Sequence, residues 1–367
     1  RVQRACTAWI PAFKRRHETR SMSKNVRIVL CGLGNVGKAL VALLAERRNE
    51  LESRYGLRLD LAAAVDINGA AIAGDRPMIP APELSAHLQS GRPVESFENY
   101  GRPAFSGVDA IEQANACALV ETTPTNLIDG EPGRTHIVAA LQRGMEVISA
   151  NKGPIGLLYR ELHDLARENE CGIHISAATA AALPTLDGGT VCLAGTSILE
   201  AEGLLNGSTN YSLCRMLDTG CLYETALEEA QQLGIAETNP SLDVEGHDTA
   251  NKLILIANRL FDTSFGPKDV QIEGITKITP QQVSDAAGAG EVMKLVGRAK
   301  RTESGVELTV APRRLKKDHP LAAVNGSEKA ISYLTDTMHR VTVSGGKSSP
   351  VGAAAALLKD LINAFAK

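Results

Sequence analysis

The stretch Val29-Leu30-Cys31-Gly32-Leu33-Gly34-Asn35-Val36-Gly37-Lys38-Ala39-Leu40 decides the fold expected for this chain. Its G-x-G-x-x-G turn lies between residues 26–30, which alternate as in a strand, and residues 40–45, where apolar side chains recur at helical spacing. The glycines therefore stand where the pyrophosphate of a dinucleotide meets a helix N-terminus. A glycine-rich turn that binds nothing is the alternative. The strand-to-helix setting favours the nucleotide, with these candidate contacts: Gly32, Gly34, Asn35, Val36 and Gly37.

The next predicted strand, residues 59–65, ends in an acidic residue, Asp66. In nucleotide-binding folds of this kind, a carboxylate at that position accepts hydrogen bonds from the adenosine ribose hydroxyls. It would repel a 2′-phosphate, and residues 67–69 offer no cation to hold one, so the pattern favours NAD over NADP. An acid that ends a strand can equally be a turn former, and Arg76 on the following loop could change the preference.

Further along, predicted strands and helices alternate in the order of a doubly wound α/β domain. Two of these strands, at 116–121 and 146–148, end in short polar segments, and ligands gather at the carboxyl ends of such strands. The following residues are therefore candidate cofactor contacts: Thr122, Thr123, Pro124, Ser149, Ala150 and Asn151. Lys152 reaches the same rim. Later strand-like segments, rich in glycine and threonine, suggest a separate mixed sheet.

Residues 235–252, I-A-E-T-N-P-S-L-D-V-E-G-H-D-T-A-N-K, place several acids and a lysine directly before the apolar run at 253–256. Asp248 and Lys252 stand one helical turn apart and share a face. An isolated pair of this kind is usually surface decoration of little energetic weight. Here the apolar run leaves the helix little room for a solvated side, and a second lysine is predicted at the nucleotide rim. We therefore expect Lys252 to point into a cleft.

Composition bounds the class of protein. At 367 residues, 44% hydrophobic and 22% charged, the chain is expected to be a soluble globular protein of two or three domains. A net charge of -3, spread along the sequence, predicts no nucleic-acid partner. Seven cysteines without a C-x-x-C pair argue for a reducing, cytoplasmic location and against a zinc site. No apolar run approaches the ~20 residues of a membrane span, so no membrane partner is expected either.

Six motifs, taken in order, resemble those of the homoserine dehydrogenases, and the resemblance runs from about Val26 almost to the C-terminus. Besides the G-x-G-x-x-G, they are T-P-T-N at 123–126, S-A-N-K-G-P at 149–154, N-G-S-T-N-Y at 206–211, the acid-lysine stretch at 236–252 and H-P-L at 319–321. The resemblance implies a Rossmann-type doubly wound nucleotide-binding domain, formed by residues 25–152 and 325–367. It also implies an α+β substrate-binding and dimerisation domain with a mixed sheet, residues 153–324. Residues 1–24, rich in arginine, are expected to be a disordered extension.

The same resemblance implies NAD(P)-dependent interconversion of L-homoserine and L-aspartate 4-semialdehyde in amino-acid biosynthesis. Lys252 would be the principal proton donor to the alkoxide, with Lys152 positioning the substrate and sharing the proton. Glu237 would receive the substrate α-ammonium. The remaining implied substrate contacts are Asp243, Asp248 and the loop Asn206, Gly207, Ser208 and Thr209, and Gly346 is an implied cofactor contact. Without a substrate role, Asp243 would cap a helix.

Departures from the family pattern bear on two other features. Members can hold a monovalent cation through backbone carbonyls, here near Ser176, Thr179 and Ala181. Ser176 stands where a glutamate is usual and alanines replace glycines, which counts against the cation. Ile235 stands for a tyrosine and Asn239 for an aspartate at the pocket edge, so a different small amino-acid-like substrate remains open. The resemblance also implies a homodimer and a short form that lacks the regulatory amino-acid-binding domain.

Two other classes stay open at this point. A phosphorylating aldehyde dehydrogenase needs a cysteine nucleophile. Cys214, close to the 206–211 motif, is the one cysteine placed to serve, but its setting favours an apolar helix position. The second class is a nucleotide-binding relative that has lost catalysis, which the altered segment at 176–182 favours and the retained acids and lysines oppose.

Overall fold

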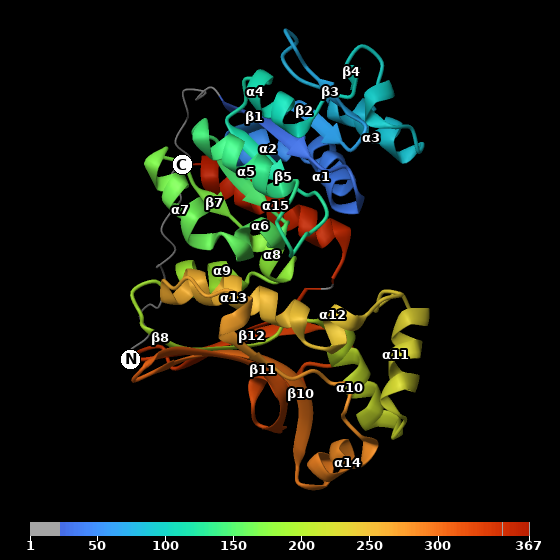
Figure 1. Ribbon diagram of the computed structural model, residues 1–367, viewed down its shortest axis with the longest axis vertical. Helices are drawn as coiled ribbons and strands as arrows, with labels where there is room; N and C mark the ends of the chain where they lie inside the picture. Colours follow the sequence, from blue (N-terminus) through green and yellow to red (C-terminus); the bar gives the residue numbers. More distant parts are fainter. Residues whose placement is uncertain (1–22, 347, 367) are drawn as a thin grey trace, which may run out of the picture.

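The computed structural model describes residues 23–346 and 348–366. Residues 1–22 of the expected extension lie outside the described residues, and the first strand already begins at Lys24. The described chain forms two sheets, the first in the upper half of Figure 1 and the second in the lower half. Helix α13 (His247–Phe261) runs between them. The α/β class predicted from the sequence is confirmed.

The first sheet has seven strands in the order β4-β3-β2-β1-β5-β6-β7. Strands β1, β2, β5, β6 and β7 are parallel, and β3 and β4 form an antiparallel edge. The strand order reverses between β1 and β5, and ligands bind at the carboxyl ends of the strands at such a reversal. The strands are β1 (Lys24–Cys31), β2 (Leu57–Asp66), β3 (Gly69–Ile72), β4 (Gly101–Pro103), β5 (Ala118–Glu121), β6 (Glu146–Ser149) and β7 (Ile173–His174).

Helices cover both faces of this sheet because its parallel strands are apolar on both sides. Val26, Ile28 and Leu30 of β1 pack in one core with α1, α3 and α15, whereas Val29 and Cys31 pack in the other with α4, α5 and α7. The helices of this half are α1 (Asn35–Glu46), α2 (Arg48–Tyr55), α3 (Ala81–Gln89), α4 (Gly107–Gln113), α5 (Gly133–Gln142), α6 (Lys152–Leu157), α7 (Tyr159–Glu168) and α15 (Pro350–Phe365).

The second sheet has six strands in the order β13-β12-β8-β10-β11-β9, antiparallel except where β9 joins β11. It is the mixed sheet expected from the sequence. One face packs against α13, so closely that a Cβ on Gly297 would lie 3.0 Å from Thr249. The strands are β8 (Ile198–Leu204), β9 (Val270–Ile272), β10 (Glu291–Thr302), β11 (Gly305–Lys316), β12 (Lys329–Thr335) and β13 (Arg340–Gly345).

The remaining helices connect the two sheets or flank the second one. Helices α10, α11 and α14 gather at one end of the second sheet, on the right in Figure 1. The helices are α8 (Ser176–Ala180), α9 (Thr185–Asp187), α10 (Gly207–Thr219), α11 (Tyr223–Gln232), α12 (Ser241–Val244) and α14 (Pro280–Gly288). Short helical turns occur at η1 (Val94–Ser96), η2 (Gly188–Cys192), η3 (Pro267–Asp269) and η4 (Pro320–Ala323).

Sheet membership differs from the expected segments at two places. Strand β7 extends the first sheet beyond residue 152, because it pairs in parallel with β6. Strands β12 and β13 belong to the second sheet, although residues 325–367 were expected in the nucleotide-binding domain, because β12 pairs with β8. Only the last helix, α15, returns to pack against α1 of the first half. The domain boundaries themselves stay a prediction.

Candidate active site

Two lysines from different elements meet on one carboxylate between the sheets. Lys252 lies on α13, one turn after Asp248, and donates a hydrogen bond to Asp248 Oδ2. Lys152, the first residue of α6, brings its Nζ to 3.8 Å from Asp248 Oδ1. The three side chains are only 14–24% exposed. The Asp248–Lys252 pair is therefore part of an enclosed cluster, not surface decoration.

In this cluster, burial and the neighbouring charges shift the pKa values of the side chains in opposite directions. Burial would raise the pKa of Asp248, but the ammonium groups of Lys252 and Lys152 lower it to about 2, so it stays ionised. Burial also lowers the pKa of Lys152, and the nearby charge of Lys252 adds to that shift, while Asp248 opposes it. A lysine whose ammonium form is disfavoured in this way can exchange a proton more easily than a free one.

Lys252 has further anchors. Its Nζ donates to the carbonyl of Leu205, just after β8, at 2.9 Å. The amide of Asn206 donates to Asp248 Oδ2 at 3.0 Å. Because Asp248 and Leu205 take two of the three N–H bonds of Lys252, its position is fixed and one donor is left for a reacting oxygen.

The predicted substrate loop forms the N-terminus of α10. Asn206 caps this helix, its Oδ1 accepting from Thr209 N at 3.1 Å. Ser208 Oγ lies 3.0 Å from both Asp243 Oδ2 and the Ile235 carbonyl. The backbone N–H groups of the first turn of a helix have no partner within the helix and attract anions.

Asp243 and Asp248 converge because the acid-lysine stretch is two helices rather than one. Gly246 separates α12 from α13 with φ +88, and a Cβ there would come within 3.1 Å of Ile272 and Val310. Asp243 lies on α12, where burial and the Asp248 charge raise its pKa. It does not cap α13, whose N-cap is Gly246. Glu237 is exposed on the preceding loop, close enough for its charge to act on Lys152.

The pocket edge that departs from the family pattern lies beside these acids. Asn239 Oδ1 accepts from Ser241 Oγ at 2.8 Å, at the start of α12. Ile235 uses its backbone carbonyl, as described above, and not its side chain to hold Ser208.

The glycine loop is held by the neighbouring strand. Gly32 has φ +96, and a Cβ on it would lie 2.6 Å from the backbone of Thr122. Thr122 Oγ1 donates to the Gly32 carbonyl at 2.7 Å. A Cβ on Gly37 would lie 2.0 Å from the same carbonyl oxygen, so no side chain fits there. Gly34 caps α1, and Asn35 and Val36 form its first turn, so the expected nucleotide contacts lie together at a helix N-terminus.

A buried pair that the sequence analysis missed supports the same rim. The carboxylate of Glu121, at the end of β5, accepts from Thr123 N at 2.8 Å and from His136 Nδ1 at 2.8 Å. Asn151 Nδ2 then donates to Thr123 Oγ1 at 3.2 Å, which ties the ends of β5 and β6 together. A charged residue closing an otherwise apolar strand was the available signal.

Cys31 completes a buried group with Glu121 and His136, their possible ligand atoms within 4.8 Å of one another. Burial raises the pKa of the Cys31 thiol well above its usual range, with the Glu121 charge adding to the shift. The Glu121 carboxylate already accepts from Thr123 and His136, which places it in the support of the loop. We therefore assign this group to support of the nucleotide rim.

Two other expected cofactor contacts lie at the edges. Asp66 ends β2, is exposed, and accepts from the backbone of Ile67 at 3.0 Å. Arg76 places its guanidinium over the Tyr100 ring, 4.9 Å from its centroid. Gly346, with φ +70, lies against the backbone of Leu183 in the segment after α8.

The segment 176–184 is braced by side chains from both halves of the molecule. Thr179 Oγ1 donates to the Ser176 carbonyl at 2.9 Å, and Ala181 takes φ +54. Lys329, another residue missed from the sequence, donates to the Ala180 carbonyl at 2.7 Å. Burial lowers the pKa of Lys329 to about 8, and the charge of Lys252 adds to the shift.

Two family models match most of the chain. Residues 32–176 match the homoserine dehydrogenase NAD-binding domain, and residues 184–362 match the homoserine dehydrogenase domain. The chain belongs to the homoserine dehydrogenase family. It is therefore an oxidoreductase with an NAD-binding domain, as its resemblance implied.

Several known homoserine dehydrogenases match this chain along nearly their whole length. The homoserine dehydrogenase of Methanocaldococcus jannaschii is 36% identical, over 92% of this chain and 98% of its own. An NAD(+)-dependent homoserine dehydrogenase of Pseudomonas canavaninivorans is 33% identical, over 92% and 95%. A solved hyperthermophilic archaeal homoserine dehydrogenase, a mutant in complex with NADPH, superposes with a TM-score of 0.79 at 26% identity, over 93% and 98%. The expectation of NAD or NADP as cofactor is confirmed at this level.

Cys214 was the candidate nucleophile of the alternative aldehyde dehydrogenase class. Cys214 is buried on α10, where its Sγ lies 3.2 Å from Lys294 Nζ, in keeping with a structural position.

None of the helices in residues 23–346 and 348–366 has the length and apolar character needed to cross a membrane.

Proposed function

We propose that this chain interconverts L-homoserine and L-aspartate 4-semialdehyde, with Lys152 and Lys252 carrying the proton. The observation that carries the proposal is the convergence of both ammonium groups on Asp248, beside the N-terminus of α10. A bound nicotinamide dinucleotide supplies the hydride acceptor for the alcohol and the hydride donor for the aldehyde. The protein's own task is to orient the substrate and to move one proton at its terminal oxygen.

Substrate orientation follows from charge. The α-carboxylate would meet the backbone N–H groups of Gly207 and Ser208 at the start of α10. The α-ammonium would meet Glu237, with Asp243 beyond it. The terminal oxygen would then face the two lysines. Because both charged groups of the α-carbon would be held at one end of the pocket, only the terminal oxygen of a small amino acid would reach the reacting position.

The two lysines are suited to different parts of the proton transfer. The family resemblance implies that Lys252 is the principal proton donor, and its two anchors support a donor held in a fixed position toward the oxygen. The lowered pKa of Lys152 supports giving it an equal part, because a neutral amine is needed when the alcohol loses its proton. Asp248 would hold the two lysines in position without taking the proton itself.

The cofactor preference rests on Asp66. Its exposed carboxylate at the end of β2 would accept hydrogen bonds from the adenosine ribose and disfavour a 2′-phosphate, so we propose NAD as the preferred cofactor. Arg76, held over Tyr100 on the following loop, would weaken this preference if it turned toward the ribose.

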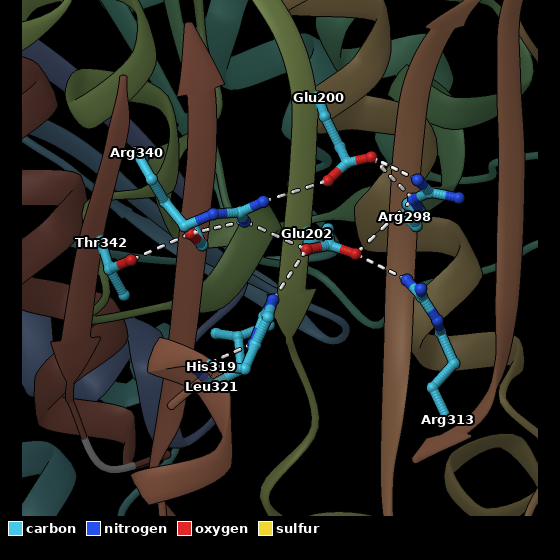
Figure 2. Close-up of polar contacts among 9 residues, drawn as sticks. Glu200, Glu202, Arg298, Arg313, His319, Leu321, Arg340 and Thr342 are labelled. Carbon is cyan, nitrogen blue, oxygen red and sulfur yellow. Dashed lines mark hydrogen bonds and ion pairs between the residues drawn. The ribbon is translucent and has the colours of Figure 1, made fainter. Parts of the chain in front are cut away.

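We also propose a homodimer formed through the face of the second sheet that α13 leaves open. Figure 2 shows two buried glutamates of β8, Glu200 and Glu202, paired with side chains from β10, β11, β13 and the residue before η4. Their partners are Arg298, Arg313, His319 and Arg340. The glutamates already have partners of opposite charge, so a second copy could cover the face without isolating them. Light scattering of the purified protein tests this, and a monomer throughout the concentration range of the assay would refute it.

Turnover decides the function. The purified protein is mixed with L-homoserine and NAD or NADP, and the absorbance band of the reduced nicotinamide is followed. We expect the band to grow, and L-2-aminobutyrate, which lacks the hydroxyl, to give nothing. A folded protein that binds cofactor but oxidises no homoserine would point to the silent-relative alternative, while turnover of another hydroxylated amino acid alone would point to a different substrate.

A further inference from the structure

Lys329 is a buried cation to which the reaction assigns no role. It opens β12, is 1% exposed, and donates to the carbonyl of Ala180, the last residue of α8, at 2.7 Å. Among the ion pairs of the described residues, none includes Lys329. An ammonium group buried without a carboxylate is costly, so its position must be compensated by the dipoles it meets.

The oxygen that Lys329 meets belongs to a turn shaped to present it. Helix α8 ends at Ala180, and the positive φ of Ala181 turns the chain sharply there. Thr179 closes the turn by donating to the Ser176 carbonyl, and Thr185 Oγ1 donates to Thr179 Oγ1 at 2.7 Å. The carbonyls of Ser176 and Ala180 are thus both engaged by groups of the protein.

A second lysine stands on the other side of the same turn. Lys359 Nζ, from α15, donates to Ser176 Oγ at 2.7 Å, and Asp360 accepts from both Ser176 Oγ and Ser176 N. Lys359 is also paired with Asp187. The Ser176 and Ala180 carbonyls of this segment are therefore taken by donors of the protein, and one of those donors is an ammonium group. The residues present do not fit a bound metal cation, because the Lys329 ammonium already holds the carbonyl at the turn and would repel a second cation beside it.

The position of Lys329 couples the segment to the reacting lysines. Lys329 belongs to the second sheet, whereas Ser176 is held by α15, which packs on the first. The charge of Lys329 is close enough to Lys252 and Asp248 to interact with both. A positive charge at this point would hold the segment against the second sheet and add to the positive field near the reacting oxygen.

We propose that the Lys329 ammonium is a built-in cation, which does at the 176–184 segment what a bound monovalent metal ion would otherwise do. Lys329 is then a positioning residue, and the protein needs neither Na⁺ nor K⁺. The effect on turnover rests on the proposed function, but the cation requirement can be tested without it.

The first experiment uses the unaltered protein. Its melting temperature and its kcat/KM are measured in NaCl, KCl and choline chloride at equal ionic strength. We expect the three salts to give the same values, because no site for a metal ion is free. A rise in either quantity that is specific to Na⁺ or K⁺ overturns the proposal. If homoserine is not oxidised at all, the proposed function fails while the melting temperatures still test the cation.

The second experiment removes the ammonium. In Lys329→Ala the Ala180 carbonyl loses its charged donor and keeps only the backbone N–H of Leu183. We expect kcat to fall by about tenfold or more in choline, the scale of a misplaced active-site segment. Na⁺, K⁺ or methylammonium should restore part of the activity and raise the melting temperature. Lys329→Met, which fills the space with an apolar chain, should lose activity without rescue.

The matched control is Lys294→Met, since Lys294 is also a buried lysine, 2% exposed, and donates to the Val324 carbonyl at 2.6 Å. It should lower stability but create no response to Na⁺ or K⁺. Two results would contradict the proposal. One is full activity of folded Lys329→Ala in choline. The other is a loss of activity that no cation reverses although the melting temperature is unchanged. If Lys329→Ala does not fold, the salt comparison on the unaltered protein still decides.

Discussion

The ammonium groups of Lys152 and Lys252 face the two oxygens of a single carboxylate, that of Asp248. Lys252 donates to Oδ2, and Lys152 Nζ lies 3.8 Å from Oδ1. One lysine is the first residue of α6 and the other lies on α13, so the pair exists only where the two halves of the molecule meet. Substitution of each of the three groups should therefore give a distinct signature.

Removal of Lys252 should abolish most turnover. We expect Lys252→Ala to lower kcat by roughly 10²-fold or more, the scale of a general acid, while the Kd of the cofactor changes little. Stopped-flow turnover and fluorescence titration of the reduced cofactor measure the two quantities. A folded variant with nearly unaltered kcat would show that Lys252 does not carry the proton.

Lys152 should set the pH dependence of homoserine oxidation. Its pKa is lowered by burial, so its neutral, proton-accepting form appears at lower pH than for a free lysine of pKa about 10.4. We expect kcat/KM for oxidation to rise with pH through an apparent pKa below that value, and Lys152→Arg to remove this limb. The exposed Lys277, changed in the same way, is the control. The same limb in Lys152→Arg as in the unaltered protein would exclude Lys152 as its source.

Asp248 should make the free energy of unfolding depend on pH in the acid range. Its folded pKa of about 2 lies below the unfolded value, so its stabilising effect is present above about pH 4 and is lost as the pH falls toward 2. Asp248→Asn should lower the free energy of unfolding by roughly 2–3 kcal/mol at neutral pH and flatten the acid dependence. Urea unfolding from pH 7 to pH 3 measures both, and equal slopes for the two proteins would refute the assignment.

Glu121 should act on cofactor binding and not on the chemical step. Glu121→Gln weakens the acceptor that holds Thr123 and His136, so the rim at the ends of β5 and β6 should loosen. We expect a rise in the KM for the cofactor of about tenfold, the effect of losing one or two buried hydrogen bonds to a charged group, with kcat less affected. A fall in kcat with an unaltered cofactor KM would place Glu121 in catalysis instead.

Asp66 should decide the cofactor. NAD should exceed NADP in kcat/KM by roughly tenfold, about 1.4 kcal/mol, and Asp66→Ala should reduce that ratio. Steady-state kinetics with each cofactor give the answer. A preference for NADP that Asp66→Ala leaves unaltered would mean that Asp66 does not face the ribose.

Patterns among neighbouring residues were enough to predict much of the fold of this protein. The strand, glycine turn and helix at residues 26–45 are specified by alternation and helical spacing over neighbouring residues. The alternation of predicted strands and helices after them indicates the doubly wound order. Asp248 and Lys252 share a helix face for the same local reason. The resemblance then supplied the order of the remaining motifs, and the family models agree with it.

Only the tertiary structure decided which buried charges meet. Lys329 stands in an ordinary stretch of sequence, and its partner Ala180 is 149 positions away. The pairing of Glu121 with His136 likewise depends on how α5 packs beside β5. Spacing along the chain predicts which side chains share one helix or strand face. It does not predict contacts between elements, because those depend on how the two sheets and α13 pack together, and that packing determines where a buried charge can find a partner.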